Sequence, residues 1–215
     1  MKNKTISEIL DNKVVIILRG VAREKLIPLL EALYSGGIRL AEITYSADGG
    51  TPDAVVADNI RLLSEAFDGR VTVGAGTVLT KEQVRLTAEA GGKFIISPDT
   101  NEAVIKESVR LGLVSIPGAL TPTEAQSAHS YGADFVKLFP ISSLGPSYIR
   151  AITAPLSHIR FLAVGGVNER NVGDYIRAGA VGVGIGGSLT SLLSENNYEA
   201  ITEMARKYVE AVRNG

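Results

Sequence analysis

A lysine and a glutamate stand among apolar residues in two separate segments of this chain. Lys137 lies inside the run FVKLF at 135–139, and Glu42 lies inside the run LAEIT at 40–44. Burying an unpaired ammonium is unfavourable, so such a lysine tends to lose its proton or to gain a carboxylate neighbour. A neutral buried lysine is a nucleophile towards carbonyl carbon. The two residues predict covalent chemistry on a carbonyl compound, with a carboxyl group to move protons.

If both runs are strands, each charged side chain lies on a defined face of its strand. Alternate residues of a strand share a face, so Lys137 lies beside the side chains of two phenylalanines, and Glu42 beside those of Leu40 and Thr44. Two other interpretations remain open at this point. Lys137 could be a strand-edge lysine whose ammonium reaches solvent, or the two charges could form a structural ion pair inside the fold.

The composition favours one soluble domain that handles small, neutral or anionic molecules. The 215 residues are 45% hydrophobic with a formal net charge of -1, and we expect 1–215 to fold as a single domain with a short N-terminal helical segment. Basic residues are scattered, so neither nucleic acid nor a membrane is an expected partner. With no cysteine and two histidines, we expect no metal and no other cofactor. No signal peptide or membrane-spanning run is evident, which predicts a cytoplasmic location.

Eight short β-branched runs alternate with helical patterns along the chain. The predicted strands are Val14–Leu18, Leu40–Tyr45, Val71–Gly74, Phe94–Ser97, Leu113–Ile116, Phe135–Phe139, Phe161–Val164 and Val181–Ile185. The predicted helices are Glu24–Tyr34, Pro52–Phe67, Lys81–Ala90, Asn101–Leu111, Pro122–Tyr131, Pro146–Ile152, Glu169–Ala178 and Tyr198–Arg213. This order predicts an α/β fold, the (β/α)8 TIM barrel, rather than an open doubly wound sheet, which typically uses fewer strands. The active site is then expected at the C-terminal ends of the strands.

Several predicted helices carry signals at their first residues. Thr80 with Gln83, and Thr121 with Glu124, have the spacing of a capping box. Thr51, before a proline, has the spacing of a capping residue followed by proline at the first helical position. These signals predict where three of the helices begin.

Polar groups and glycines follow several predicted strands. Arg19 follows the first, Thr77 follows a glycine-rich end of the third, and Pro98 follows the fourth. An arginine at a barrel rim can bind a carboxylate or phosphate through two hydrogen bonds, and a threonine offers a hydroxyl. A solvated arginine and ordinary turn chemistry explain the same residues, and both alternatives stay open.

Glycine-rich loops follow the predicted seventh and eighth strands, where barrels of this kind often hold a phosphate group. The loops contain Gly165, Gly166, Gly186, Gly187 and Ser188. The letters at 182–187 also satisfy the dinucleotide-binding pattern GxGxxG. Too little chain follows them to build the rest of a dinucleotide-binding sheet, so we reject that interpretation.

The same segments resemble the 2-keto-3-deoxy-6-phosphogluconate / 4-hydroxy-2-oxoglutarate aldolase family from about residue 14 to 213. The resemblance is carried by ILRG at 17–20, AEIT at 41–44, GAGTVL at 74–79, ISP at 96–98, IPG at 116–118, VKLFP at 136–140, VGGV at 164–167 and GIGGS at 184–188. It implies a class I aldolase that cleaves a 2-keto-3-deoxy-6-phospho sugar acid to pyruvate and glyceraldehyde 3-phosphate. It also implies a homotrimer.

The resemblance implies roles for individual residues. Lys137 would form the Schiff base with the 2-keto carbon, and Glu42 would be the acid–base group. Thr44, on the strand face of Glu42, is a further candidate for substrate binding. The pyruvyl carboxylate end would be contacted by Thr77 and Arg19, the pocket walls would include Phe139 and Pro98, and the phosphate would be held by Gly165, Gly166, Gly186, Gly187 and Ser188.

Two departures from the gluconate-type pattern leave alternatives open. Ser46 stands where those enzymes commonly have an arginine, and Ala163-Val164 stands where they tend to have Pro-Thr. The second departure looks like the 2-keto-3-deoxy-6-phosphogalactonate branch. Because of the first, a catalytically idle phosphosugar-binding protein is one alternative. A phosphosugar isomerase or epimerase that uses Glu42 as its base is another.

Overall fold

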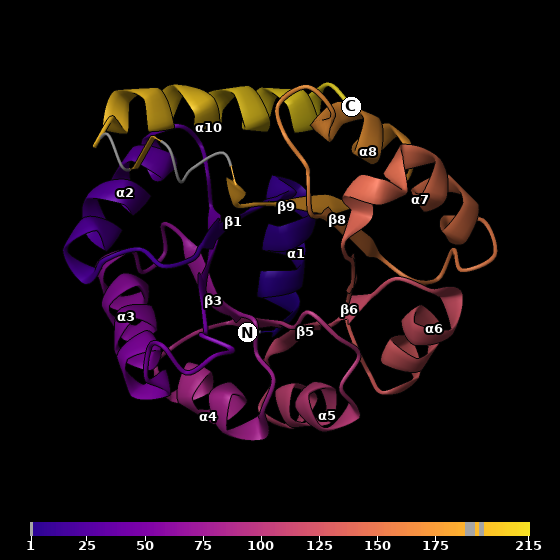
Figure 1. The fold of residues 1–215 in the computed structure, drawn as a ribbon, viewed down its shortest axis with the longest axis horizontal. Helices are drawn as coiled ribbons and strands as arrows, with labels where there is room; N and C mark the ends of the chain where they lie inside the picture. The colour runs from indigo at the N-terminus through magenta and orange to yellow at the C-terminus, as the bar shows by residue number, and fades with distance from the viewer. Residues whose placement is uncertain (1, 188–191, 194–195) are drawn as a thin grey trace.

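A computed structural model describes residues 2–187, 192–193 and 196–215, and its parallel strands are arranged as a barrel surrounded by helices (Figure 1). The sheet order is β5-β4-β3-β2-β1-β9-β8-β7-β6. The strands are β1 (Val14–Leu18), β2 (Leu40–Thr44), β3 (Thr72–Gly76), β4 (Phe94–Ile96), β5 (Val114–Ile116), β6 (Gly118–Ala119), β7 (Val136–Leu138), β8 (Phe161–Val164) and β9 (Gly182–Ile185). Since β5 and β6 are joined through one residue, the two ends of the sheet meet.

The predicted fifth strand, Leu113–Ile116, is matched by β5, and the short β6 beyond its predicted end gives the sheet nine strands where eight were expected. Pro117 separates β5 from β6, and proline has no backbone N–H to donate to a ladder. The seam is nevertheless closed by hydrogen bonds. The carbonyl of Pro117 accepts from the N–H of Lys137 at 2.8 Å, and the carbonyl of Ser115 in β5 accepts from the N–H of Phe135, just before β7, at 3.2 Å. The predicted (β/α)8 barrel is confirmed, with one interrupted strand.

Outer helices follow the strands and form a ring around them (Figure 1). No helix within the described ranges is both long and apolar enough to cross a membrane. The helices are α2 (Arg23–Ser35), α3 (Asp53–Ala66), α4 (Lys81–Glu89), α5 (Glu102–Arg110), α6 (Pro122–Ser130), α7 (Gly145–Thr153), α8 (Val172–Arg177) and α10 (Tyr198–Arg213), with a 3-10 turn η1 (Ile141–Ser143) before α7.

Two of the three predicted helix starts are confirmed. Both capping boxes form, at Thr80 on α4 and at Thr121 on α6. The prediction for Thr51 is wrong, because α3 begins at Asp53 and Pro52 is its capping residue, without a side-chain cap. Pro52 has φ -58 and ψ 141, an extended conformation, which leaves Thr51 one residue too far back to reach the first helical N–H groups.

The remaining helix, α1 (Lys2–Asn12), lies across the N-terminal end of the barrel and within the ring of outer helices in Figure 1. Ile9 of α1 is fully buried in the interior cluster with Val15 and Leu40. Lys2 pairs with Asp134 at 3.0 Å. Because α1 covers this end, a ligand that reaches the barrel interior must approach from the C-terminal ends of the strands.

The strands bury both faces, as expected for a parallel sheet covered by helices. On β7, Val136 and Leu138 pack outward in the large core beneath the helices. Phe135, just before β7, packs inside the barrel with Leu40 of β2. The alternation predicted for both charged strands is therefore confirmed, and it directs Lys137 and Glu42 into the barrel.

Candidate active site

Lys137 and Glu42 are buried in the barrel interior, at the centres of β7 and β2. Lys137 is 7% exposed and Glu42 is 2% exposed. The interpretation of Lys137 as a solvated strand-edge lysine is wrong, because β7 is paired on both sides and the side chain is buried. Both residues line a cavity of about 10 Å³, close to the volume that one water molecule needs. The rest of the lining is apolar: Val15, Ile17, Ile96, Ile116, Leu162, Val164 and Gly184.

The carboxyl group of Glu42 is incompletely satisfied. Its Oε2 is buried and has no hydrogen-bond partner within the described part of the chain. A structural ion pair inside a barrel would need its charges in contact and its remaining atoms hydrogen-bonded. Glu42 instead keeps a free acceptor beside the cavity that Lys137 also lines, as a proton-transfer group would.

Burial shifts the pKa of both groups in directions that suit catalysis. Desolvation raises the pKa of Glu42 from 4.5 to about 7, while the positive charges of Lys137 and Arg19 oppose that rise. Desolvation also lowers the pKa of Lys137, with Glu42 opposing the shift and Arg19 adding to it. A carboxyl group with a pKa near 7 can take up and release a proton at neutral pH. A lysine with a lowered pKa has a larger fraction of neutral, nucleophilic amine.

The space for the Glu42 carboxyl group depends on a glycine of the neighbouring strand. Thr44 of β2 pairs with Gly76 of β3. A Cβ atom at Gly76 would lie 2.2 Å from Oε1 of Glu42, far inside van der Waals contact. Ordinary turn chemistry was one interpretation of the glycine-rich end of this strand. Gly76 instead makes room for a side chain, which no sequence motif indicated.

We therefore expect Gly76→Ala to reduce cleavage activity at least about tenfold and to destabilise the fold by about 1–3 kcal/mol, the usual range for overpacking. Steady-state kinetics and urea unfolding measure the two effects. The double variant Gly76→Ala with Glu42→Asp withdraws the carboxyl group and should recover stability without recovering activity. Equal instability of both variants would contradict the assigned clash.

Arg19 and Thr77 meet at the rim, from the ends of β1 and β3. Arg19 Nη2 donates to Thr77 Oγ1 at 3.1 Å. Thr77 has φ +53, a left-handed conformation that is uncommon for a β-branched residue. Strained conformations of this kind often occur at functional sites. The contact joins a cation and a hydroxyl, two groups that bind carboxylates.

Three further predicted residues lie near the C-terminal ends of the strands. The ring of Phe139 is 4.5 Å from Lys137 Nζ, measured to the ring centroid. Thr44 is 8% exposed, and its Oγ1 has no hydrogen-bond partner in the described ranges, so it can bind a ligand hydroxyl. Pro98 follows β4 and is half-buried. Its carbonyl packs against Gly118, where a Cβ atom would lie 2.3 Å away.

The glycines predicted to bind phosphate gather at the ends of two adjacent strands. Gly165 and Gly166 follow β8 with φ +96 and +74, and Gly186 and Gly187 follow β9, which pairs with β8. Gly187 faces open space, where even an added Cβ would have no neighbour within 4 Å. The fifth predicted residue, Ser188, lies outside the described residues.

Two residues that the sequence interpretation did not identify shape the first of these loops. A Cβ atom at Gly166 would lie 2.5 Å from Cβ of Ser142 in η1. Asn171 Nδ2 donates to the carbonyl of Gly166 at 3.0 Å. The run Ser142-Ser143 and the sequence VNERN at 167–171 were visible, but their packing depends on the fold.

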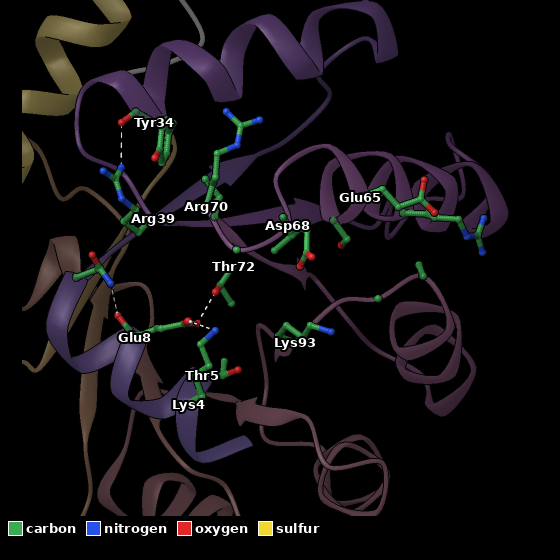
Figure 2. A pocket seen from close by; sticks show the side chains of 18 of the residues that line it. Lys4, Thr5, Glu8, Tyr34, Arg39, Glu65, Asp68, Arg70, Thr72 and Lys93 are labelled. Atoms are coloured by element: carbon green, nitrogen blue, oxygen red, sulfur yellow. Dashed lines mark hydrogen bonds and ion pairs between the residues drawn. The ribbon is translucent and has the colours of Figure 1, made fainter. Parts of the chain in front are cut away.

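A second, wider cavity, of about 1120 Å³, lies at the other end of the barrel (Figure 2). It is bounded by α1 and by the segments that lead into β2, β3 and β4. Charged residues of both signs line it, and several are already paired: Thr72 donates to Glu8, and Arg39 donates to the carbonyl of Tyr34 at 2.9 Å. Across the described ranges no group of three histidine, aspartate or glutamate residues could hold a metal. We therefore place the candidate active site at Lys137 and Glu42.

Comparison with known proteins identifies relatives along most of the chain. Residues 6–204 match the family of KDPG and KHG aldolases. The chain is 34% identical over 200 residues to the 2-dehydro-3-deoxy-6-phosphogalactonate aldolase of Escherichia coli (strain K12), covering 93% of this chain and 94% of that protein. The solved structure "Native KDPGal structure" has a TM-score of 0.84 and 33% identity, with 94% of each chain covered. KDPG aldolase from Legionella pneumophila, with pyruvate captured as a covalent carbinolamine intermediate, has a TM-score of 0.83 and 27% identity, covering 94% of this chain and 96% of that one.

Proposed function

The chain belongs to the KDPG and KHG aldolase family, and we propose from this premise that Lys137 is its Schiff-base lysine and Glu42 its acid–base group. The protein is a class I aldolase that cleaves a 2-keto-3-deoxy-6-phospho sugar acid to pyruvate and glyceraldehyde 3-phosphate. One observation carries the residue assignment. Lys137 and Glu42 line a single buried cavity that is otherwise apolar.

The proposed mechanism begins with the amine of Lys137. The neutral amine attacks the 2-keto carbon, and the carbinolamine, once its hydroxyl is protonated, loses water to give a protonated imine, the iminium ion. The carboxylate of Glu42 then removes the proton of the C4 hydroxyl. As the C3–C4 bond breaks, its electron pair moves into the imine and forms an enamine, and C4 leaves as the aldehyde of glyceraldehyde 3-phosphate. The protonated Glu42 returns the proton to C3, and hydrolysis of the imine releases pyruvate.

The other site residues are proposed to bind the two ends of the substrate. Arg19 and Thr77 offer donors to the carboxylate next to the 2-keto carbon. The unpartnered hydroxyl of Thr44 is available to a substrate hydroxyl. The phosphate is proposed to bind at the loops after β8 and β9, where backbone N–H groups can donate to its oxygens. These loops contain the predicted Gly165, Gly166, Gly186, Gly187 and Ser188.

We propose the phosphogalactonate-type acid as the preferred substrate. The two acids differ in stereochemistry at one hydroxyl. Val164, the last residue of β8, lines the same cavity as Lys137 and Glu42, whereas gluconate-type enzymes tend to have threonine at this position. An apolar side chain leaves a nearby substrate hydroxyl without a partner, which disfavours the epimer that would point there.

A pyruvate-release assay on both epimeric acids tests this proposal. We expect the phosphogalactonate-type acid to have the higher kcat/KM, and Val164→Thr to move the ratio towards the gluconate-type acid by about tenfold, the effect of one buried hydrogen bond. Val164→Ile, which stays apolar, is the control and should not move the ratio in that direction. A wild-type preference for the gluconate-type acid would contradict the substrate proposal. Release of pyruvate from neither acid would favour the idle binding protein.

We further propose that the chain folds as one domain and acts in the cytoplasm, as its sequence predicts, and that it assembles as a homotrimer, as the family resemblance implies. Light scattering on the purified protein should give three times the mass of one chain. A monomeric mass at micromolar concentration would contradict the proposed assembly.

A further inference from the structure

The side-chain amide of Gln83 connects two loops at the rim of the candidate site. Gln83 lies in the first turn of α4 and is 6% exposed. Its Oε1 accepts from the backbone N–H groups of Leu79 at 2.8 Å and Thr80 at 3.3 Å. Its Nε2 donates to Oδ1 of Asp53 at 3.2 Å. One buried amide therefore joins the loop after β3 to the start of α3, which ends the loop after β2.

Two buried hydroxyl groups donate hydrogen bonds to the backbone of Gln83. Its backbone carbonyl accepts from Thr87 Oγ1 at 2.7 Å and from the hydroxyl of Tyr45 at 3.3 Å. Tyr45 follows Thr44 at the end of β2 and is 1% exposed. Burial raises the pKa of Tyr45 to about 12, so its hydroxyl keeps its proton and remains a donor. Together with the bonds of its side chain, these contacts link Gln83 to β2, to α3 and to the loop after β3.

The loop that Gln83 holds contains the strained Thr77. A β-branched residue at φ +53 is in a disfavoured backbone conformation, so its surroundings must hold it there. Val78, the next residue, donates its N–H to the carbonyl of Ile96 at 3.1 Å, and the N–H groups of the next two residues both donate to Gln83. Without the side chain of Gln83, this loop would lose the two hydrogen bonds made by Leu79 and Thr80, two and three residues after Thr77.

We propose that Gln83 is a positioning residue for substrate binding: it holds the loop after β3 so that Thr77 and Arg19 face the substrate carboxylate together. Gln83 itself touches none of the reacting atoms. The identity of the ligand rests on the proposed aldolase function, whereas the holding of the loop does not. Because the effect is on binding rather than on the chemical step, its loss should raise KM more than it lowers kcat.

The principal test is Gln83→Met, which keeps the length of the side chain and removes its donor and acceptor. We expect KM for the keto acid to rise about tenfold while kcat changes by less than about threefold, the pattern of lost uniform binding. The pyruvate concentration for half-maximal borohydride trapping at Lys137 should rise by a similar factor. A KM within twofold of wild type would overturn the proposal. A fall in kcat as large as the rise in KM would also overturn it.

Two further variants separate positioning from a general loss of helix capping. Gln83→Glu with Asp53→Asn reverses donor and acceptor in the contact with Asp53 and keeps an oxygen for the loop N–H groups, so KM should return to within about threefold of wild type. Glu124→Met removes the matching box on α6, where Glu124 accepts from Leu120 and Thr121 at 2.9 and 2.8 Å. That loop carries none of the proposed site residues. A KM shift in Glu124→Met as large as in Gln83→Met would overturn the proposal.

Hydrogen–deuterium exchange distinguishes this inference from the proposed function. In Gln83→Met the amides of Leu79 and Thr80 should exchange at least about tenfold faster than in wild type, whatever the protein catalyses. Unchanged exchange would overturn the inference even for an active aldolase. If wild type forms no adduct with pyruvate, the proposed function fails, and the exchange result still decides whether Gln83 holds the loop.

Discussion

Replacement of Lys137 by methionine is expected to remove cleavage activity, by at least about 10⁴-fold in kcat, because the other described residues that line its cavity carry no amine to form the imine. Methionine keeps the length and apolar packing of the buried stem, and the barrel should therefore fold. Incubation of wild type with pyruvate and borohydride should add a pyruvyl-derived mass at Lys137, whereas Lys137→Met should gain none. Mass spectrometry of the intact protein and of its peptides measures this.

Lys137→Arg serves as the matched control for charge. It keeps a cation beside Glu42 but cannot lose its proton at neutral pH, so it should be as inactive as Lys137→Met. Residual turnover in Lys137→Arg near the wild-type rate would favour the isomerase or epimerase interpretation, in which the lysine only supplies charge. Trapping of pyruvate at another lysine would contradict the assignment of the nucleophile.

The strand face on which the side chains of Lys137 and Glu42 lie could be predicted from sequence, because the alternation of side chains along a strand is a local property. Alternation within LAEIT and FVKLF places every second side chain on one face, and the burial of Leu40 and Phe135 inside the barrel agrees with it. The two charged side chains share a cavity because both point into the barrel, and a closed barrel has only one interior.

Other features depend on register and packing, which a single sequence does not contain. The clearance of Gly76 for Glu42 requires the pairing of β2 with β3, and the contact of Arg19 with Thr77 requires the twist of three neighbouring strand ends. Thr51 was misassigned because Pro52 can either begin a helix or precede it, and the local sequence permits both. The capping box of Thr80 was predicted, but the link from Gln83 to Asp53 joins loops that are 30 residues apart.

The free acceptor on Glu42 is matched to the chemistry that the buried lysine requires. An imine on Lys137 withdraws electrons but moves no protons, so the cleavage step needs a base beside it. A carboxyl group exposed to solvent would have a pKa near 4.5 and would be a poor acid at neutral pH. The burial that produces a pKa of about 7 is therefore part of catalysis. The same burial makes the stability of the folded protein depend on pH.

Glu42→Gln is expected to lower kcat by about 10²- to 10⁴-fold, the usual contribution of a general acid–base group, and to leave borohydride trapping of pyruvate at Lys137 in place. In wild type, deuterium exchange of the pyruvate methyl protons should rise with pH through a midpoint near 7, because the carboxylate is the base. Glu42→Gln should lose this dependence. Since burial raises the pKa of Glu42, the folded state resists its ionisation, and this contribution to stability is complete below pH 4.5 and lost as pH rises towards 7. Urea unfolding should therefore show Glu42→Gln gaining stability relative to wild type over that interval. A variant that keeps the wild-type exchange profile would show that another group moves the proton.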